Sequence, residues 1–248
     1  MRDLTGKKAW ITGAGSGIGR GAAVELARAG MHCILSGRRG SALEETAREI
    51  EGVGGSATVE VLDVTDAQAV GAVAQRIAEL DGPLDTLVNS AGMNILERNW
   101  PVASPADFQS VIDANLQGTF NCCQAALPQM RSKRTGLIIN VSSWAGKFPA
   151  RLTGPGYSAA KAAVVALSTS LNLEEWKNGV RACALCPGEV ATPIMDTRPE
   201  PPSQEARATM LQIEDMSETI LFLARLHERA CVNEVIISPT YNCLADSH

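Results

Sequence analysis

The sequence has 248 residues, a net charge of −5 and 45% hydrophobic residues, which is ordinary usage for a globular chain. The negative charge argues against nucleic acid as the main partner, because phosphate binding needs a basic surface. No apolar run approaches the ~18 residues of a membrane-spanning helix, and residues 1–8 turn polar at once, unlike a signal peptide. We therefore expect a cytoplasmic protein with no membrane partner.

Strands and helices are predicted to alternate along the chain. The expected strands are 9–12, 32–35, 57–62, 84–88, 137–141, 180–185 and 232–237, and the expected helices are 18–29, 41–51, 66–80, 105–130, 156–176 and 213–226. Because the strands are continuous apolar runs, they predict an α/β fold: one Rossmann-type, doubly wound domain over residues 1–248. Its parallel sheet should have about seven strands, with helices on both faces. Residues 192–212 are interpreted as a short lid beside a site.

A glycine loop joins the first expected strand to the first expected helix. Gly13, Gly17 and Gly19 follow the spacing G-x-x-x-G-x-G, with Ser16 and Ile18 between them. Glycines at this position let the backbone approach a pyrophosphate, and a helix N-terminus supplies amide donors and a positive dipole. The loop therefore predicts a dinucleotide-binding site.

The end of the second expected strand bears on which dinucleotide is bound. NAD-binding versions of this fold place an acid there for the ribose hydroxyl, whereas this chain reads Ser36-Gly37-Arg38-Arg39. A guanidinium matches a phosphate with two parallel hydrogen bonds. We therefore expect NADP(H), with NAD(H) still possible, and we assign Arg38 to the cofactor and Arg39 to solvent.

Polar and small residues follow the other strands at the edge where such sheets bind ligands. Asp63 is placed for an adenine amino group, and Thr192 for a carboxamide. The full set of cofactor-binding candidates at these strand ends is Asp63, Val64, Asn89, Ala91, Gly92, Pro187, Gly188, Val190 and Thr192.

The seven cysteines are interpreted as buried, reduced side chains. Cys183 and Cys186 form a C-x-x-C pattern, but no second pair or nearby histidine completes a zinc set. We therefore expect no metal site.

Tyr157 and Lys161 lie four residues apart in a helix-forming run, so they share one helical face. With them, the chain resembles the short-chain dehydrogenase/reductase family over essentially its full length. The Ser36-Gly37-Arg38-Arg39 stretch and the ending Val232-Asn233-Glu234-Val235-Ile236-Ile237-Ser238-Pro239 look most like its NADP-dependent serine/3-hydroxy acid dehydrogenase branch. The matching motifs are Thr12-Gly13-x-x-x-Gly17-Ile18-Gly19, Asn89-x-Ala91-Gly92, Asn115, Ser143, Tyr157-x-x-x-Lys161 and Pro187-Gly188.

The resemblance implies a hydride-transferring oxidoreductase with four catalytic residues. Tyr157 would be the general acid and base, and Lys161, with the nicotinamide charge, would lower the phenol pKa and hold the ribose. Ser143 would bind the substrate oxygen, and Asn115 would hold a water of a proton relay. Tyr157 and Lys161 thus also belong to the cofactor site. The family's packing of helices 105–130 and 156–176 implies a homotetramer or homodimer.

The substrate is harder to predict, because the Ser143–Tyr157 separation is one residue longer than the family's usual spacing. The expected pocket wall is mostly apolar and aromatic, which fits a small to medium ketone or secondary alcohol; it comprises Met93, Asn94, Ile95, Trp144, Phe148, Glu189 and Met195. Arg151 could pair with a substrate carboxylate, although a lone loop arginine is more often solvated. A non-catalytic dinucleotide sensor is the alternative function, but it would not need the complete Asn-Ser-Tyr-Lys set.

Overall fold

The computed structural model describes residues 1–241 and contains a seven-stranded sheet in which every neighbouring pair is parallel. The strands are β1 (Lys8–Thr12), β2 (His32–Gly37), β3 (Ser56–Val61), β4 (Leu84–Asn89), β5 (Gly136–Val141), β6 (Val180–Pro187) and β7 (Glu234–Ile237). Their order in the sheet is β3-β2-β1-β4-β5-β6-β7. The chain therefore reverses its direction across the sheet between β1 and β4, which is where ligands bind in sheets of this type.

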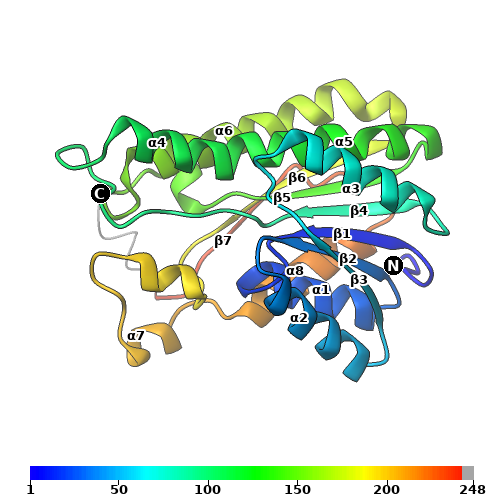
Figure 1. Cartoon of the computed structure of the whole chain (residues 1–248), viewed down its shortest axis with the longest axis horizontal. Helices are drawn as coiled ribbons and strands as arrows, with labels where there is room; N and C mark the ends of the chain where they lie inside the picture. The colour runs from blue at the N-terminus through cyan, green and yellow to red at the C-terminus, as the bar shows by residue number, and fades with distance from the viewer. Residues whose placement is uncertain (242–248) are drawn as a thin grey trace.

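Helices cover both faces of this sheet (Figure 1). One face carries α1 (Gly17–Arg28), α2 (Gly40–Gly52) and α8 (Ile213–Arg225), and the other carries α3 (Ala67–Glu79), α4 (Pro105–Ile112), α5 (Gly118–Lys133) and α6 (Gly154–Glu175). The predicted doubly wound α/β architecture is confirmed. No helix within residues 1–241 is long and apolar enough to cross a membrane.

Burial of the strands follows their place in the sheet. Every residue of β1, β4, β5 and β6 is buried, whereas the edge strands β3 and β7 are partly exposed. Two apolar clusters result, one beneath each helical layer, and they explain why the central strands read as unbroken apolar runs. This rigid core fixes the carboxyl ends of β1, β4, β5 and β6 next to one another.

The predicted single helix 105–130 is interrupted in the structure. A π-helical turn, Asp113–Gln117, separates α4 from α5. Within it, the Asn115 side chain donates from Nδ2 to the carbonyl oxygens of Val111 (2.9 Å) and Met93 (2.8 Å). A polar side chain that bonds to its own helix competes with the regular ladder, and such turns occur often at functional sites. The periodicity of the sequence does not reveal this interruption.

Residues 192–212, which were predicted to form a lid, follow the end of β6, and the two ends of this segment lie next to each other. It holds a 3₁₀ turn, Pro193–Thr197, and the short helix α7 (Gln204–Ala208). Its two ends are joined, because the Leu211 amide donates to the Glu189 carbonyl at 3.0 Å and the Ala191 amide donates to Leu211 at 2.8 Å. Figure 1 shows this segment beside the sheet, at the end opposite the N-terminus.

Candidate active site

A large cavity opens at the carboxyl ends of β1, β4, β5 and β6. Most of the predicted site residues line it: Gly13, Ser16, Gly17, Ile18, Ala91, Gly92, Asn115, Ser143, Tyr157, Lys161, Pro187, Gly188, Val190 and Thr192. Five of the predicted residues lie outside this lining: Gly19, Arg38, Asp63, Val64 and Asn89. Segments that are far apart in the sequence therefore meet around one space.

The glycine loop is held against the end of β4. The Thr12 hydroxyl oxygen accepts hydrogen bonds from the backbone amides of Ser90 and Ala91, each at 3.2 Å. Gly13 has a φ of +67°, and a Cβ there would lie 2.8 Å from the Ser90 carbonyl and the Ala91 amide. Glycine is thus required at position 13 by the contact between these two loops within the chain itself.

The N-terminus of α1 forms one wall of the cavity. Ser16 is the N-cap residue in extended conformation, and its side chain makes no capping hydrogen bond to the described residues. The first amides of the helix are therefore available to a ligand, with the positive end of the helix dipole behind them. A Cβ on Gly17 would lie 3.2 Å from the Thr192 side chain, so the glycine loop packs closely against the segment that follows β6.

The two adjacent serines after β5 have different surroundings. Ser142 is buried, and its hydroxyl donates to the Lys161 carbonyl at 2.7 Å. Ser143 is half-buried, lines the cavity, and accepts a hydrogen bond from the Ala145 amide at 3.1 Å. Its hydroxyl also hydrogen bonds to the Tyr157 phenol. Ser143 is therefore the serine in position to act on a molecule in the cavity.

Lys161, Gly92 and Asn115 converge behind the tyrosine. The Lys161 amine donates to the Val141 carbonyl at 2.8 Å and lies 5.6 Å from the centre of the Tyr157 ring. A Cβ on Gly92 would lie 2.6 Å from Asn115 Oδ1 and 3.5 Å from the Lys161 amine nitrogen. Asn115 Oδ1 is buried and has no hydrogen-bond partner in residues 1–241. Asn115 Oδ1 and the Lys161 amine therefore both lie close to Gly92.

Burial controls the proton affinities of the two catalytic candidates. It raises the pKa of the Tyr157 phenol, and Ser143, Arg98 and Arg198 offset this only in part. Burial also lowers the pKa of the Lys161 amine to about 8. Among residues 1–241, the positive groups that lower the phenol pKa are the two arginines. The effect of Lys161 together with the nicotinamide charge stays a prediction. A hydrogen bond and two cations thus oppose desolvation.

The residues predicted to bind the adenine end of the cofactor lie outside the lining of the cavity. Arg38 is exposed at the end of β2 and near Asp63, where it helps to lower the pKa of that carboxyl after the hydrogen bonds from Thr65. Asp63 Oδ1 accepts from the Thr65 amide at 3.0 Å and from its hydroxyl at 2.8 Å. The Val64 carbonyl accepts from Asn121 at 2.9 Å. Arg38 is thus exposed and Asp63 half-buried, whereas Val64 is buried, and none of the three lines the cavity.

Asn89 lies beneath the cavity floor. It is buried, and its Nδ2 donates to Asn140 Oδ1 at 2.9 Å, while Asn140 Nδ2 donates to the Ser168 hydroxyl at 2.9 Å. This chain of hydrogen bonds ties β4 to β5 and α6. Gly19 also acts within the chain, since a Cβ there would lie 2.5 Å from the Gly13 carbonyl oxygen. Both residues brace the loops that form the cavity.

Two arginines that the sequence did not single out also line the cavity. Arg98 follows β4 and is buried, and Arg198 follows the 3₁₀ turn after β6. Their position shortly after strand carboxyl ends is a signal that a sequence reader could have used. Arg151, in contrast, is exposed and outside the lining, as expected for a solvated loop arginine.

The fold and this site are those of a dinucleotide-dependent oxidoreductase, and comparison with known proteins identifies the family. The family model for short chain dehydrogenase matches residues 7–202. The chain belongs to this family of NAD(P)-dependent dehydrogenases and reductases, which act on small molecules that carry an alcohol or carbonyl group.

Named relatives and solved structures agree with this assignment. The oxidoreductase UcpA of Salmonella typhimurium is 39% identical over 197 residues, which cover 79% of this chain and 74% of UcpA. An uncharacterized oxidoreductase of Staphylococcus saprophyticus is 34% identical over 241 residues, covering 96% of this chain and 100% of that one. The alcohol dehydrogenase of the archaeon Thermococcus sibiricus, complexed with 5-hydroxy-NADP, superposes with a TM-score of 0.85 at 28% identity, covering 95% of this chain and 97% of its own.

Proposed function

We propose that this protein is an NADP(H)-dependent carbonyl reductase or alcohol dehydrogenase in which Tyr157 is the general acid and base. The observation that carries the proposal is the convergence of Tyr157, Ser143 and Lys161 on a cavity that the N-terminus of α1 also lines. A sensor that only bound a dinucleotide would need the helix N-terminus but not the phenol, hydroxyl and amine.

In the direction of reduction, NADP(H) supplies the hydride when it is bound. Ser143 donates a hydrogen bond to the carbonyl oxygen and fixes it beside the phenol. As negative charge develops on that oxygen, Tyr157 transfers its proton to it and becomes a phenolate. The Lys161 amine, with a pKa of about 8, can be charged or neutral near neutral pH and can return a proton by way of a water at Asn115 Oδ1.

The preference for NADP(H) rests on Arg38. It is exposed at the end of β2, at the outer end of the proposed cofactor site, where its guanidinium can pair with a ribose phosphate. Two of the similar solved structures are described as complexes with NADP or 5-hydroxy-NADP. NAD(H) is the alternative cofactor, and a measured preference for NADH would remove this part of the proposal.

The remaining predicted features are compatible with the same function. Residues 192–212 would act as a lid, since Thr192, Met195 and Arg198 line the cavity. A homodimer or homotetramer would cover large apolar side chains that α4, α5 and α6 leave exposed: Phe108, Phe120 and Leu173. Residues 1–248 would form one domain, with the cofactor and substrate sharing one cavity.

Turnover of carbonyl compounds tests the proposal directly. Purified protein is mixed with NADPH or NADH and a panel of ketones, and absorbance at 340 nm is followed. We expect activity in the wild type and a loss of about 10²- to 10⁴-fold in Tyr157→Phe, with NADPH still bound by both proteins. Full activity of Tyr157→Phe would contradict the mechanism. NADPH binding without any turnover in the wild type would favour the sensor.

A further inference from the structure

Arg98 is a buried cation that joins three segments around the cavity. It is 6% exposed, lies between β4 and α4, and lines the same cavity as Tyr157 and Ser143. Its Nη2 donates to the Thr197 carbonyl oxygen, in the segment that follows β6. A Cβ on Gly154, the first residue of α6, would lie 2.9 Å from the Arg98 Cβ and 3.0 Å from its Cγ. The Arg98 side chain therefore packs against the helical turn that carries Tyr157.

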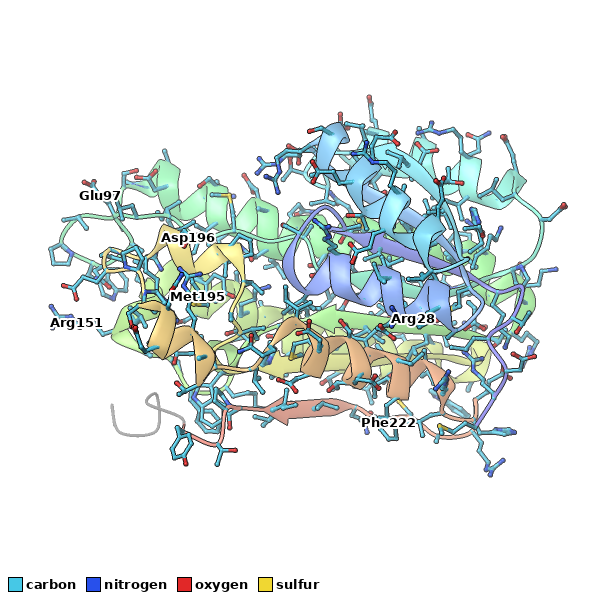
Figure 2. The ribbon with its side chains drawn as sticks, turned by 90° about the horizontal axis from the view of Figure 1, so that it is seen from below. Arg28, Glu97, Arg151, Met195, Asp196 and Phe222 are labelled. Carbon is cyan, nitrogen blue, oxygen red and sulfur yellow. The ribbon has the colours of Figure 1, made fainter. Side chains whose placement is uncertain are left out.

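A second hydrogen bond fixes the same loop to the start of α6. The Asn94 side chain donates from Nδ2 to the Thr153 carbonyl oxygen at 3.0 Å. Figure 2 shows Glu97 and Asp196, which directly precede the two residues joined by the arginine, at the same end of the molecule. The loop after β4 is thus held both to the start of α6 and to residues 193–197.

The stability of the fold gives no reason for a cation at this position. Burial lowers the pKa of the Arg98 guanidinium, and the neighbouring charge of Arg198 lowers it further. The Nε–H of Arg98 is buried and finds no hydrogen-bond partner among residues 1–241. Burying a cation with an unmet donor costs free energy that an apolar side chain of similar length would not cost. The charge of Arg98 therefore calls for a role in the chemistry of the cavity.

Arg98 and Tyr157 favour each other's charged forms. Tyr157 raises the pKa of the guanidinium, while Arg98 and, to a smaller extent, Arg198 lower the pKa of the phenol, which burial raises. Charges interact more strongly in a buried site than in bulk water. Arg198 is paired with the Glu189 carboxylate at 2.8 Å, so much of its charge is compensated. Arg98 is therefore the main cation that the chain places on the phenol.

The remaining polar groups beside the phenol do not replace this charge. The Ser143 hydroxyl is neutral and contributes a hydrogen bond to Tyr157. The Lys161 amine donates to the Val141 carbonyl and has a pKa of about 8, so it loses its charge above that pH. A guanidinium remains charged throughout this range. Arg98 thus supplies a cation that does not depend on pH.

We propose that Arg98 is a positioning residue for the proton transfer: it holds residues 193–197 against the cavity through the Thr197 carbonyl, and its charge stabilises the phenolate form of Tyr157. Arg98 acts on the reaction through Tyr157 and does not need to touch the substrate. The inference rests on the proposed function, because the phenolate that Arg98 stabilises is the form in which Tyr157 accepts a proton.

A titration of the phenol itself tests the electrostatic role without turnover. The chain has two tyrosines, so in a Tyr241→Phe parent the ultraviolet absorbance of tyrosinate reports on Tyr157 alone. The titration is run without and with NADP⁺, and circular dichroism at each pH shows whether the fold is intact. We expect the phenol of Arg98→Met to titrate about 1 pH unit higher than that of the parent. Arg98→Lys keeps a cation and should recover most of this shift.

The pH dependence of alcohol oxidation tests the same role in the reaction. The probe pair is cyclohexanol with NADP⁺, and kcat/KM is measured across the alkaline inflection that reports the catalytic base. In Arg98→Met the inflection should move up by about 1 pH unit, with kcat/KM roughly 3- to 10-fold lower below it and within a few-fold of the parent above it. A merely structural role would lower kcat/KM by the same factor at every pH.

Matched variants separate the charge from the packing of the side chain. Arg151→Gln removes an exposed arginine outside the cavity lining and should leave both the titration and the rate profile unchanged. Figure 2 shows Arg151 at the outer edge of the molecule. If Arg98→Met fails to fold, Arg98→Gln takes its place, because its amide can still donate to the Thr197 carbonyl. Failure of both neutral variants to fold would show that the fold needs the charge, and would overturn the proposal.

The two measurements keep this inference distinct from the proposed function. A phenol titration that depends on Arg98, without turnover of any alcohol or ketone, would support the electrostatic role and overturn the proposed function. Turnover with an unshifted titration and an unshifted rate profile in Arg98→Met would overturn the role of Arg98 alone. Equal shifts in Arg98→Met and Arg98→Lys would also overturn it, because the charge would then not be the cause.

Discussion

Replacing Lys161 by methionine should remove a pH dependence of the free energy of unfolding, which arises because burial lowers the pKa of the Lys161 amine. Burial lowers the amine pKa from 10.5 to about 8, whereas in the unfolded chain it keeps its ordinary value. Between these two pH values the unfolded chain binds more protons than the folded one, so the stability contributed by this group rises with pH. From pH 7 to pH 9.5 the wild type should gain about 2 kcal/mol relative to Lys161→Met, at about 1.4 kcal/mol for each unit of pKa difference.

Urea unfolding, followed by the fluorescence of the four tryptophans under reducing conditions, measures this difference at each pH. Other groups titrate over the same range, including the cysteines, but they cancel between wild type and variant. Lys133→Met is the control, since Lys133 is exposed and its loss should leave the pH dependence of stability unaltered. If the stability difference between wild type and Lys161→Met stayed constant from pH 7 to pH 9.5, the amine would not be desolvated and the proposed proton return through Lys161 would lose its basis.

Two further substitutions test the geometry around the site. Gly92→Ala places a Cβ 2.6 Å from Asn115 Oδ1, so we expect kcat to fall roughly 10-fold in a folded protein. The control is Gly71→Ala, whose added Cβ meets no described atom within 4 Å. Equal activity of the two variants would argue against the proton relay through Asn115. Arg38→Ala should raise KM for NADPH by roughly 10-fold or more and leave KM for NADH little changed, as measured by initial rates. Equal effects on the two KM values would show that Arg38 does not bind the ribose phosphate.

The sequence predicted most of the fold because its signals are local. Unbroken apolar runs predicted the central strands, and the predicted start of a helix at residue 105 agrees with α4, where the Ser104 hydroxyl accepts from the Asp107 amide at 3.0 Å. The helix boundaries agree to within a few residues. The π turn at 113–117 was missed, because a side chain that bonds to the backbone of its own helix leaves no mark in hydrophobic periodicity.

The sequence likewise predicted some parts of the site and missed others. The glycine loop and the Tyr157–Lys161 pair depend on spacing within one loop or one helix, so the sequence alone could place them. The structure adds that Asn89 and Gly19 brace the loops from below rather than line the cavity. Spacing at a strand end indicates which residues gather there, but it does not distinguish a side chain that faces the cavity from one that packs beneath it.

The sequence by itself determined the parallel sheet, the position of the dinucleotide loop and the family of oxidoreductases to which the chain belongs. Only the tertiary structure brought Arg98 and Arg198, from the segments after β4 and β6, to the cavity that Trp144 was predicted to line. The physical reason is that these residues come from loops of different lengths, whose paths are decided by packing between segments. It is the packing of these segments that buries Arg98, which its place in the sequence does not reveal.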